Sequence, residues 1–462
     1  MKRALKTLFF FALFFGVIWI VVLGYWNSSN RAISAADIWM YLVALPLGAA
    51  VVIYFAHSFW QRRTASPPPS DTAPAPSAAE APAPAERLPG SKIAILGSAL
   101  ICAAGNSVAE LAERIKQGDD VVDLDPELRN ADGFPIMTAR VADLDTSEIT
   151  ASLRTDPARK PPREQTLRAV LLAERVVTDC LQGLASTTEL SIRCLSADVW
   201  TSEEQAFAQQ RIELALSRLK LKTDSLSWQS GVDASQTWRD IEQFALQRPH
   251  DESHPLLCLV ATGSALSASA VDNLAAAGRL FSATNQHGSV PGEAAAAVLL
   301  SSPEGALAQQ IPTQSLLLVP VCEAVTQAQS RQRVDHSTLA RLFNTVLGEA
   351  SIAASDIVGV VCDGDHPAPR GAEIASAMTE ATEHLDPVAQ RASVNAYCGD
   401  SGAVAPLLAL ALGAFQSQEL QQPVLTAMLS PEHLRGATLL MPAPAPVAAV
   451  EQAAASSSEK LS

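Results

Sequence analysis

The chain has 462 residues, of which 48% are hydrophobic, and it carries a formal net charge of −15 with a sequence pI near 5.0. This length is enough for one large core or for two fused halves of ordinary domain size. The acidic balance argues against nucleic-acid binding, because phosphate contact depends on clustered lysine and arginine. The seven cysteines show neither a C-x-x-C pair nor a zinc-ligand spacing. We therefore expect no disulfide framework, no structural metal and a reducing compartment.

Two uncharged hydrophobic runs near the amino terminus predict a transmembrane hairpin over residues 1–63. They extend from Leu8 to Trp26 and from Ile38 to Trp60, and each has the roughly 20 residues that cross a ~30 Å hydrocarbon layer. Tyrosine and tryptophan at the ends of the runs match the interfacial belt of membrane proteins. A cleavable signal peptide is the alternative for the first run, but no small-residue cleavage site precedes a mature domain and a second run follows.

Basic residues indicate the orientation of the predicted hairpin. Three precede the first run, Arg62 and Arg63 follow the second, and only Arg31 lies between the runs. The positive-inside rule then places both ends of the hairpin in the cytoplasm. The cysteine usage agrees with this placement.

The composition changes after the second run. Residues 64–90 contain three consecutive prolines and repeated Ala-Pro pairs, which form neither a helix nor a ladder of hydrogen bonds, so they predict an extended linker. Residues 446–462 are rich in alanine and serine and predict a disordered tail. The globular region is therefore expected to cover residues 91–445.

Buried strands alternate with helices in the globular region, and the two stretches have a similar order. This alternation predicts a layered α/β fold with halves at about 91–310 and 311–445. We expect strands at Lys92–Gly97, Leu256–Ser264, Ser315–Val321, Val358–Val361, Val424–Leu429 and Ala437–Met441. We expect helices at Val108–Gly118, Thr166–Leu184, Arg211–Leu221, Gln236–Leu246, Thr338–Glu349 and Gly371–Thr382. The sequence is least informative over residues 190–250, where three tryptophans are expected to be core or interface anchors.

The most informative stretch extends from Ser393 to Gly413. A strand-like run meets a tight turn, Gly399–Gly402, and an alanine- and leucine-rich helix with almost no polar face follows. A helix that is apolar all round is normally enclosed by protein or by lipid. Because the flanking sequence is typical of a soluble domain, and because Pro406 and Gly413 interrupt the helix, we predict that it lies in a protein core.

This stretch resembles the carboxy-terminal signature of the thiolase/β-ketoacyl synthase superfamily, in which a histidine stands where this chain has Asp400. The segment Gly288–Leu300 resembles the ketosynthase element that begins the strand closing the first half of that fold. The opening strand, the turn Gly105–Ser107 and the helix after it are also similar to the ketosynthase start. The resemblance covers most of 91–445 and implies a thiolase-like layered fold of two similar halves.

A condensing enzyme of this superfamily uses a thiolate at a helix N-terminus, together with two histidines that assist the reaction and hold the thioester oxygen. By the resemblance, the nucleophile belongs at the start of the helix Gln236–Leu246, where this chain has Ser235 or Ala234. The first histidine belongs at Asp363 and the second at Asp400. All three positions depart from the family pattern. This implies a pseudo-enzyme that lacks the catalytic set and needs neither cofactor nor metal.

Other residues of the chain could supply a nucleophile. Cys398 lies beside Asp400 in the sequence, and a neighbouring carboxylate raises the pKa of a thiol. Cys398 is therefore a poor thiolate unless His366 or His287 folds beside it. Ser235 with Asp400 and His366 would be needed for a hydrolytic triad, and we rank this arrangement far below the pseudo-enzyme.

Two functions remain open. A transmembrane hairpin, a proline-rich linker and a degenerate thiolase-like body resemble the adaptor proteins that load lipase effectors onto the type VI secretion spike of Gram-negative bacteria. This resemblance implies a non-catalytic adaptor in the bacterial inner membrane, with a cytoplasmic carboxy-terminal domain. Its partners would be a phospholipase effector and a spike protein, and the resemblance to the superfamily leaves a homodimer open. The alternative is a membrane-associated acyl-thioester enzyme with rearranged catalytic residues.

Overall fold

The computed structural model describes residues 90–443, except for 120, 143, 148, 151–160, 186–188, 247–254, 326–334 and 365–367. The predicted hairpin over 1–63 and the predicted tail over 446–462 lie outside the described residues. The predicted linker over 64–90 also lies outside them, apart from its last residue. The described residues therefore belong to the globular region.

The described part of the chain forms one mixed sheet of eleven strands and a small two-stranded sheet. The large sheet contains β1 (Lys92–Cys102), β4 (Glu189–Ser196), β5 (Lys222–Ser230), β6 (Leu256–Ser264), β7 (Glu293–Ser301), β8 (Ser315–Leu318), β9 (Val321–Ala324), β10 (Val360–Cys362), β11 (Arg391–Ser393), β12 (Val424–Met428) and β13 (Leu434–Pro442). The small sheet is the hairpin of β2 (Asp123–Arg129) and β3 (Pro135–Thr138).

The large sheet contains the same topology twice. Its order is β11-β10-β12-β13-β8-β1-β7-β6-β4-β5, with β9 paired to β13. When the five main strands of each half are numbered along the chain, both halves have the order 3-2-4-5-1. In both halves the second strand is parallel to the third and fourth, and the fifth is antiparallel to its neighbours. The halves join where their first strands, β1 and β8, pair antiparallel.

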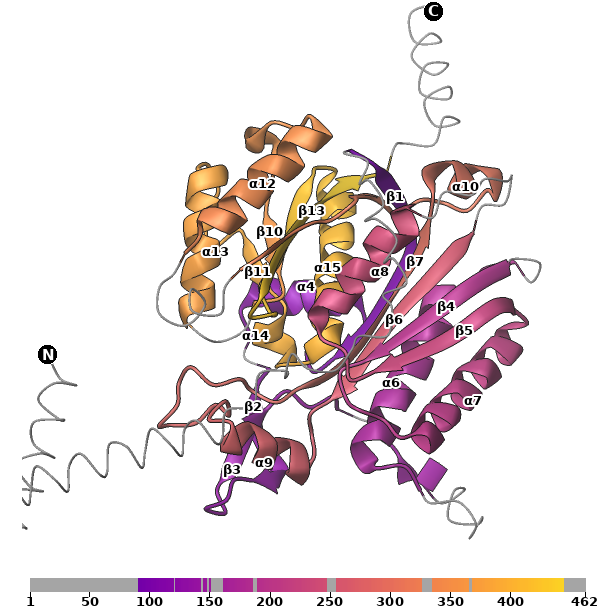
Figure 1. The fold of residues 1–462 in the computed structure, drawn as a ribbon, viewed down its shortest axis with the longest axis vertical. Coiled ribbons are helices and arrows are strands. Elements are labelled where there is room, and N and C mark those ends of the chain that lie inside the picture. Colours follow the sequence, from indigo (N-terminus) through magenta and orange to yellow (C-terminus); the bar gives the residue numbers. More distant parts are fainter. Residues whose placement is uncertain are drawn as a thin grey trace, which may run out of the picture. The chain divides into compact units, whose positions relative to one another are not determined.

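Helices form three layers around these strands (Figure 1). They are α4 (Val108–Gln117), α6 (Glu164–Leu181), α7 (Ser202–Leu219), α8 (Ala234–Leu246), α9 (Ala268–Ala276), α10 (Pro303–Ala308), α12 (Ser337–Ala350), α13 (Ala368–Ala381), α14 (Asn395–Cys398) and α15 (Ala405–Leu420), with 3-10 turns η2 (Ala354–Asp356) and η3 (Gly402–Val404). Helices α8 and α15 lie between the two halves, and α15 contacts strands of both. Helices α6 and α7 cover the outer face of the first half, and α12 and α13 cover that of the second.

The strand β7 shows why strands between two helical layers must be apolar along their whole length. Ala294, Ala296 and Val298 belong to the core around α15, whereas Ala295 and Ala297 belong to the core beneath α6. Successive side chains of a strand point to opposite faces of the sheet. A strand covered by helices on both faces is therefore apolar at nearly every position. The predicted layered α/β class is confirmed as a mixed α/β fold with a large mixed sheet.

The apolar helix at the centre is α15. All its residues from Ala405 to Ala414 are buried, and it begins with Pro406 in its first turn, where the missing N–H leaves no hydrogen bond unmade. Among the described residues, the segment Gly402–Leu420 is the helix that is long and apolar enough to cross a membrane, and most of it is buried inside the protein. This position confirms the prediction that the helix packs in a protein core.

The bounds of several elements differ from the sequence-based expectation. Helix α4 lies within its predicted range, since Ser107 caps its start by accepting a hydrogen bond from the Glu110 amide and Gly118 ends it in the left-handed conformation. However, α7 begins at Ser202, because Thr201 and Glu204 form a capping box upstream of the predicted start. The region 190–250 contains β4, α7, β5 and α8, and a proline follows β8 and separates it from β9.

Candidate functional site

The two motifs that carry the resemblance pack directly against each other. The turn after α14 places the carbonyl oxygen of Cys398 2.1 Å from the position that a Cβ on Gly292 would occupy. Gly399 has a φ of 67°, and a Cβ on it would lie 2.8 Å from the α-carbon of Gly292, so neither residue has room for a side chain. The Asp400 amide donates a 2.7 Å hydrogen bond to the Val290 carbonyl. The segment before β7 and the turn before α15 therefore form one unit.

The same turn also meets the ends of β4 and β6. A Cβ on Gly402, which has a φ of 60°, would lie 2.6 Å from the Cβ of Ala197. A Cβ on Gly263 would lie 3.2 Å from the Ser401 carbonyl oxygen. The Thr237 hydroxyl of α8 donates a 3.1 Å hydrogen bond to the Ala403 carbonyl. The structure thus brings the start of α8 next to the turn that carries Asp400.

Ser235 lies at the start of α8 and is buried. Its hydroxyl donates to Asp233 Oδ1 at 2.5 Å and accepts from Arg239 Nη2 at 2.9 Å. A histidine, His433, also approaches this group, but its Nε2 lies 3.9 Å from Asp233 Oδ2 and so meets the aspartate rather than the serine. Ser235 therefore belongs to a capping network, in which the hydroxyl has a carboxylate and a guanidinium as partners.

Asp400 is also held by local contacts. Its Oδ1 accepts a 3.2 Å hydrogen bond from the Gly402 amide, and its Oδ2 lies 3.7 Å from Arg279 Nη2. The arginine comes from the loop before β7 and is more than half exposed, whereas the carboxylate is about a quarter exposed. Two members of the low-ranked hydrolytic triad, Ser235 and Asp400, lie in the described part of the chain. The serine and Asp400 have separate partners, and the histidine lies outside the described part of the chain.

Asp363 follows β10 and is fully buried. Its Oδ1 accepts hydrogen bonds from the amides of Leu429 at 2.5 Å and Ser430 at 3.1 Å, and its backbone carbonyl accepts from Asn395 Nδ2 at 2.9 Å. Burial raises the pKa of Asp363 to about 6, although these amide donors favour the charged form. Asp363 therefore ties the end of β10 to the loop after β12 and to the start of α14.

Cys398 has a partner that the sequence did not indicate. Its buried thiol is hydrogen-bonded to that of Cys102, the last residue of β1, and this contact together with burial raises the pKa of Cys398. His287, one of the two histidines that could have activated the thiol, is exposed on the loop before β7. Cys398 is a poor thiolate, as expected, but Cys102 and burial are the causes rather than the neighbouring carboxylate.

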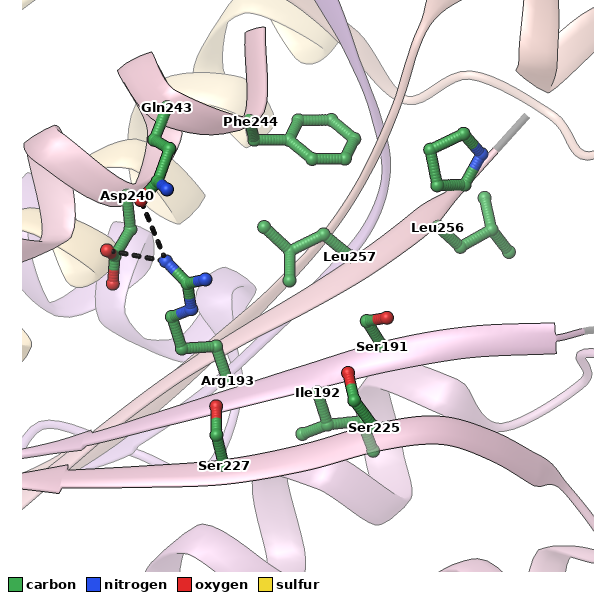
Figure 2. A pocket seen from close by; sticks show the side chains of 11 residues that line it. Ser191, Ile192, Arg193, Ser225, Ser227, Asp240, Gln243, Phe244, Leu256 and Leu257 are labelled. Carbon is green, nitrogen blue, oxygen red and sulfur yellow. Dashed lines mark hydrogen bonds and ion pairs between the residues drawn. The ribbon is translucent and has the colours of Figure 1, made fainter. Parts of the chain in front are cut away.

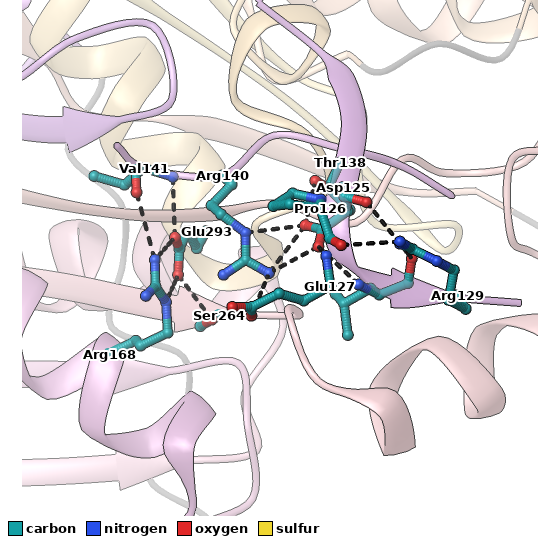
Figure 3. Close-up of polar contacts among 11 residues, drawn as sticks. Asp125, Pro126, Glu127, Arg129, Thr138, Arg140, Val141, Arg168, Ser264 and Glu293 are labelled. Atoms are coloured by element: carbon teal, nitrogen blue, oxygen red, sulfur yellow. Dashed lines mark hydrogen bonds and ion pairs between the residues drawn. The ribbon is translucent and has the colours of Figure 1, made fainter. Parts of the chain in front are cut away.

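A buried ion pair stabilises the other side of this site (Figure 3). Glu293, the first residue of β7, accepts from Arg168 Nε at 2.8 Å and Nη2 at 2.5 Å, from Ser264 Oγ at 3.0 Å and from the Val141 amide at 2.9 Å. The carboxylate is inaccessible to solvent and the guanidinium is 8% exposed. Both carboxylate oxygens have partners, so the pair is a structural connection between α6, β6, β7 and the segment after β3.

A second charged group attaches the hairpin of β2 and β3 to this region (Figure 3). Asp125 accepts hydrogen bonds from Arg140 Nε and Nη2 at 2.9 and 3.1 Å and from the Thr138 hydroxyl at 2.8 Å. Burial opposes ionisation, but Arg140 and the amides of Leu128 and Glu127 outweigh it and lower the pKa of Asp125 to about 2. Both carboxylate oxygens of Asp125 have hydrogen-bond partners, so this residue has a structural role.

No direct hydrogen bond or ion pair joins any two of Ser235, Asp363 and Asp400 in the described part of the chain. Within the same residues, no group of three histidine, cysteine or carboxylate side chains could hold a metal ion. The Ser235 hydroxyl contacts the side chains of Asp233 and Arg239, whereas Asp363 and Asp400 accept hydrogen bonds from nearby backbone amides.

The fold is similar to that of solved ketosynthases. A chain of the complex between a type II polyketide acyl-carrier protein and its ketosynthase has a TM-score of 0.56 and 12% identity, over 77% of this chain and 100% of that chain. A β-ketoacyl synthase from Burkholderia phymatum has a TM-score of 0.54 and 15% identity, over 77% of this chain and 100% of that chain. The ketosynthase of module 6 of the bacillaene synthase from Bacillus subtilis has a TM-score of 0.56 and 13% identity, over 77% of this chain and 73% of that chain.

No protein-family model and no curated protein matches the sequence. At these identities the likeness to solved structures shows the fold alone. The chain therefore has a thiolase/ketosynthase-type fold, as the motifs predicted, and the residues at its centre must decide the function.

Proposed function

We propose that this protein is a non-catalytic, membrane-tethered adaptor with a ketosynthase-type fold, which binds a partner protein and delivers it. One observation carries the proposal. At the three positions where the superfamily places its nucleophile and its two histidines, this chain has Ser235, Asp363 and Asp400, and each of these side chains is hydrogen-bonded within the fold.

The chemistry of condensation supports this conclusion. A thiolate attacks the acyl thioester, and imidazole donors stabilise the oxyanion that forms in the transition state. Ser235 has a carboxylate and a guanidinium as neighbours, and it is buried. The nearby thiol of Cys398 is protonated at neutral pH because its pKa is raised. A fold can persist as a binding scaffold after its catalytic groups are replaced.

The resemblance to lipase adaptors supplies the partner. The predicted hairpin over 1–63 would hold the chain in the bacterial inner membrane, and the linker over 64–90 would let the cytoplasmic domain reach a phospholipase effector and a secretion spike protein. In this arrangement the domain provides a rigid binding surface, and the hairpin keeps that surface at the membrane.

Affinity capture of the full-length chain from the membranes of its native host tests the proposal. We expect a phospholipase effector and a spike protein to be captured with the wild type, and to be retained by Ser235→Ala and by Cys398→Ala. Purified wild-type chain that turns over acyl-coenzyme A or acyl-carrier substrates, with turnover lost in either variant, would instead establish the acyl-thioester enzyme.

A further inference from the structure

A polar pocket lies on the inner face of the first half of the sheet, near its edge (Figure 2). Ser191 and Arg193 of β4 point to this face, because they are two residues apart on one strand. The register of β4 and β5 pairs Ser191 with Ser225 and Arg193 with Ser227. One arginine and three serines therefore lie together, beneath the carboxy-terminal half of α8.

The guanidinium of Arg193 uses only one of its edges within the described part of the protein. Its Nη1 donates to Asp240 Oδ1 at 2.8 Å and to Gln243 Oε1 at 3.4 Å. Its Nε and Nη2 have no hydrogen-bond partner among the described residues. These two nitrogens form the edge that binds a carboxylate with two parallel hydrogen bonds. Figure 2 shows this edge directed toward the space beside Leu257 and Ser227.

Other arginines of the chain show what that edge normally binds. In each of six arginines of the described residues, both Nε and Nη2 donate to a carboxylate of the chain itself. They are Arg140, Arg163, Arg168, Arg211, Arg341 and Arg435, with Asp125, Glu204, Glu293, Glu174, Glu323 and Glu373 as the respective acceptors. Arg193 is 27% exposed and its partner Asp240 is buried, so its exposure lies within the range of this group. It differs in that its bidentate edge faces a pocket.

The rest of the pocket is suited to one carboxylate. Its volume is about 200 Å³, and the hydroxyls of Ser191, Ser225 and Ser227 have no hydrogen-bond partner in the part of the chain that the structure describes. Phe244 and Leu257 add an apolar wall to the lining. The charge of Arg193 is already balanced by one buried aspartate, so a singly charged carboxylate fits better than a phosphate dianion.

We propose that this pocket binds an acidic side chain of the partner protein, with the carboxylate on the Nε and Nη2 edge of Arg193 and the serine hydroxyls around it. The inference rests on the proposed function, because it names the surface through which the adaptor recognises its partner. The pocket is next to β5, which is the last strand of the sheet and has one unpaired edge among the described strands. An extended partner segment can therefore approach the pocket from the side.

Two capped tripeptides test this site on the full-length chain. They are acetyl-Val-Glu-Val-amide and acetyl-Val-Gln-Val-amide, which differ in charge at nearly equal size, and calorimetry measures their binding. We expect the glutamyl peptide to bind at least about tenfold more tightly, because only a carboxylate accepts both hydrogen bonds as an anion. Arg193→Lys should weaken this preference, because lysine keeps the charge but loses the planar edge that binds both carboxylate oxygens. Arg341→Lys, which changes an exposed arginine paired with Glu323, should leave the preference unchanged.

A second measurement needs no variant and so is independent of folding. Phenylglyoxal modifies accessible guanidinium groups, and mass spectrometry locates the adducts. We expect Arg193 to be modified in the wild type and to be protected by the glutamyl peptide but not by the glutaminyl peptide. Equal binding of the two peptides, or an unreactive Arg193, would overturn the proposal. Protection that increases with protein concentration would also overturn it, because a second copy of the chain would then occupy the pocket.

Failure of this inference and failure of the proposed function are distinguishable. If the wild type and Arg193→Lys capture the same partner from membranes, the adaptor function stands and the pocket is not its recognition site. If the wild type captures no partner while the peptide preference is present, the pocket binds carboxylates and the adaptor function is wrong.

Discussion

The carbonyl oxygen of Cys398 and the α-carbon of Gly292 are packed so closely that a Cβ on the glycine would stand 2.1 Å from that oxygen. One residue belongs to the turn before α15 and the other to the segment before β7. Their contact joins the two halves of the fold beside the turn that carries Asp400.

Gly292→Ala is therefore expected to destabilise the protein by about 3 kcal/mol or more, because a backbone atom rather than a flexible side chain must move. Gly348→Ala is the matched control. Gly348 lies inside α12 with no atom within 4 Å of its would-be Cβ, so alanine should stabilise the helix by about 0.5–1 kcal/mol. Urea unfolding of both variants measures the difference. Similar midpoints for the two would show that the contact at Gly292 is not tight.

Asp363 is expected to make the protein less stable as the pH rises. Burial raises its pKa from 3.8 to about 6, so between these values the folded state holds a proton that the unfolded state has lost. Stability is therefore higher below about pH 4 and falls until about pH 6, by on the order of 3 kcal/mol. Asp363→Asn keeps an oxygen for the amides of Leu429 and Ser430 and should remove this dependence.

The control for this measurement is Asp386→Asn. Asp386 is exposed, and the amides of Val388 and Ala389 lower its pKa, so its contribution has the opposite sign. Unfolding curves at several pH values between about 4 and 7.5 cover the titration of Asp363, whereas the lowered pKa of Asp386 lies below this range, so Asp386→Asn should leave the pH dependence as in the wild type. An unchanged pH dependence in Asp363→Asn would contradict the buried, partly protonated carboxyl.

Removal of one partner from the buried ion pair of Arg168 and Glu293 is expected to destabilise the protein strongly. Arg168→Met leaves a carboxylate without its counter-charge in the core, which should cost about 3–5 kcal/mol. Arg341→Met breaks the exposed pair with Glu323 and should cost about 0–1 kcal/mol. Denaturant unfolding compares the two variants. If both had the same small effect, the site around Glu293 would be open to water.

The cysteines are expected to differ widely in their reaction with N-ethylmaleimide. Cys322 is exposed, whereas Cys398 is buried against Cys102 and has a raised pKa. Because the thiolate is the reactive form, Cys322 should be labelled much faster in the folded protein. Peptide mapping over time locates the label. Early modification of Cys398 would indicate an accessible, activated thiol and would favour the enzyme over the adaptor.

Much of the fold could be predicted from the sequence, because the layers impose a strong pattern. Strands such as β6 and β7 are covered on both faces, so they are apolar throughout and easy to recognise. The strands β4 and β5 are harder to recognise, since polar residues alternate with apolar ones where one face meets a pocket. The start of α7 was predicted too late in the chain, although the capping box of Thr201 and Glu204 is a signal for it in the sequence.

The local setting of Asp400 was predictable from the sequence, but its contacts were not. The motifs located Asp400 correctly in a turn before a buried helix, yet its partner Arg279 comes from a loop far away in the sequence. The pairing of Cys102 with Cys398 likewise depends on how β1 and α14 meet in space. Neither motif nor periodicity carries that information. The free edge of Arg193 is visible only in the folded chain, because its neighbours come from β5, α8 and β6.

A non-catalytic adaptor is expected to take up no acyl group at Ser235 or Cys398. The most direct test is intact-mass spectrometry of the purified full-length chain after incubation with acetyl- and malonyl-coenzyme A. We predict an unchanged mass and no release of coenzyme A. A covalent acyl adduct on Ser235 or Cys398 would contradict the proposed function.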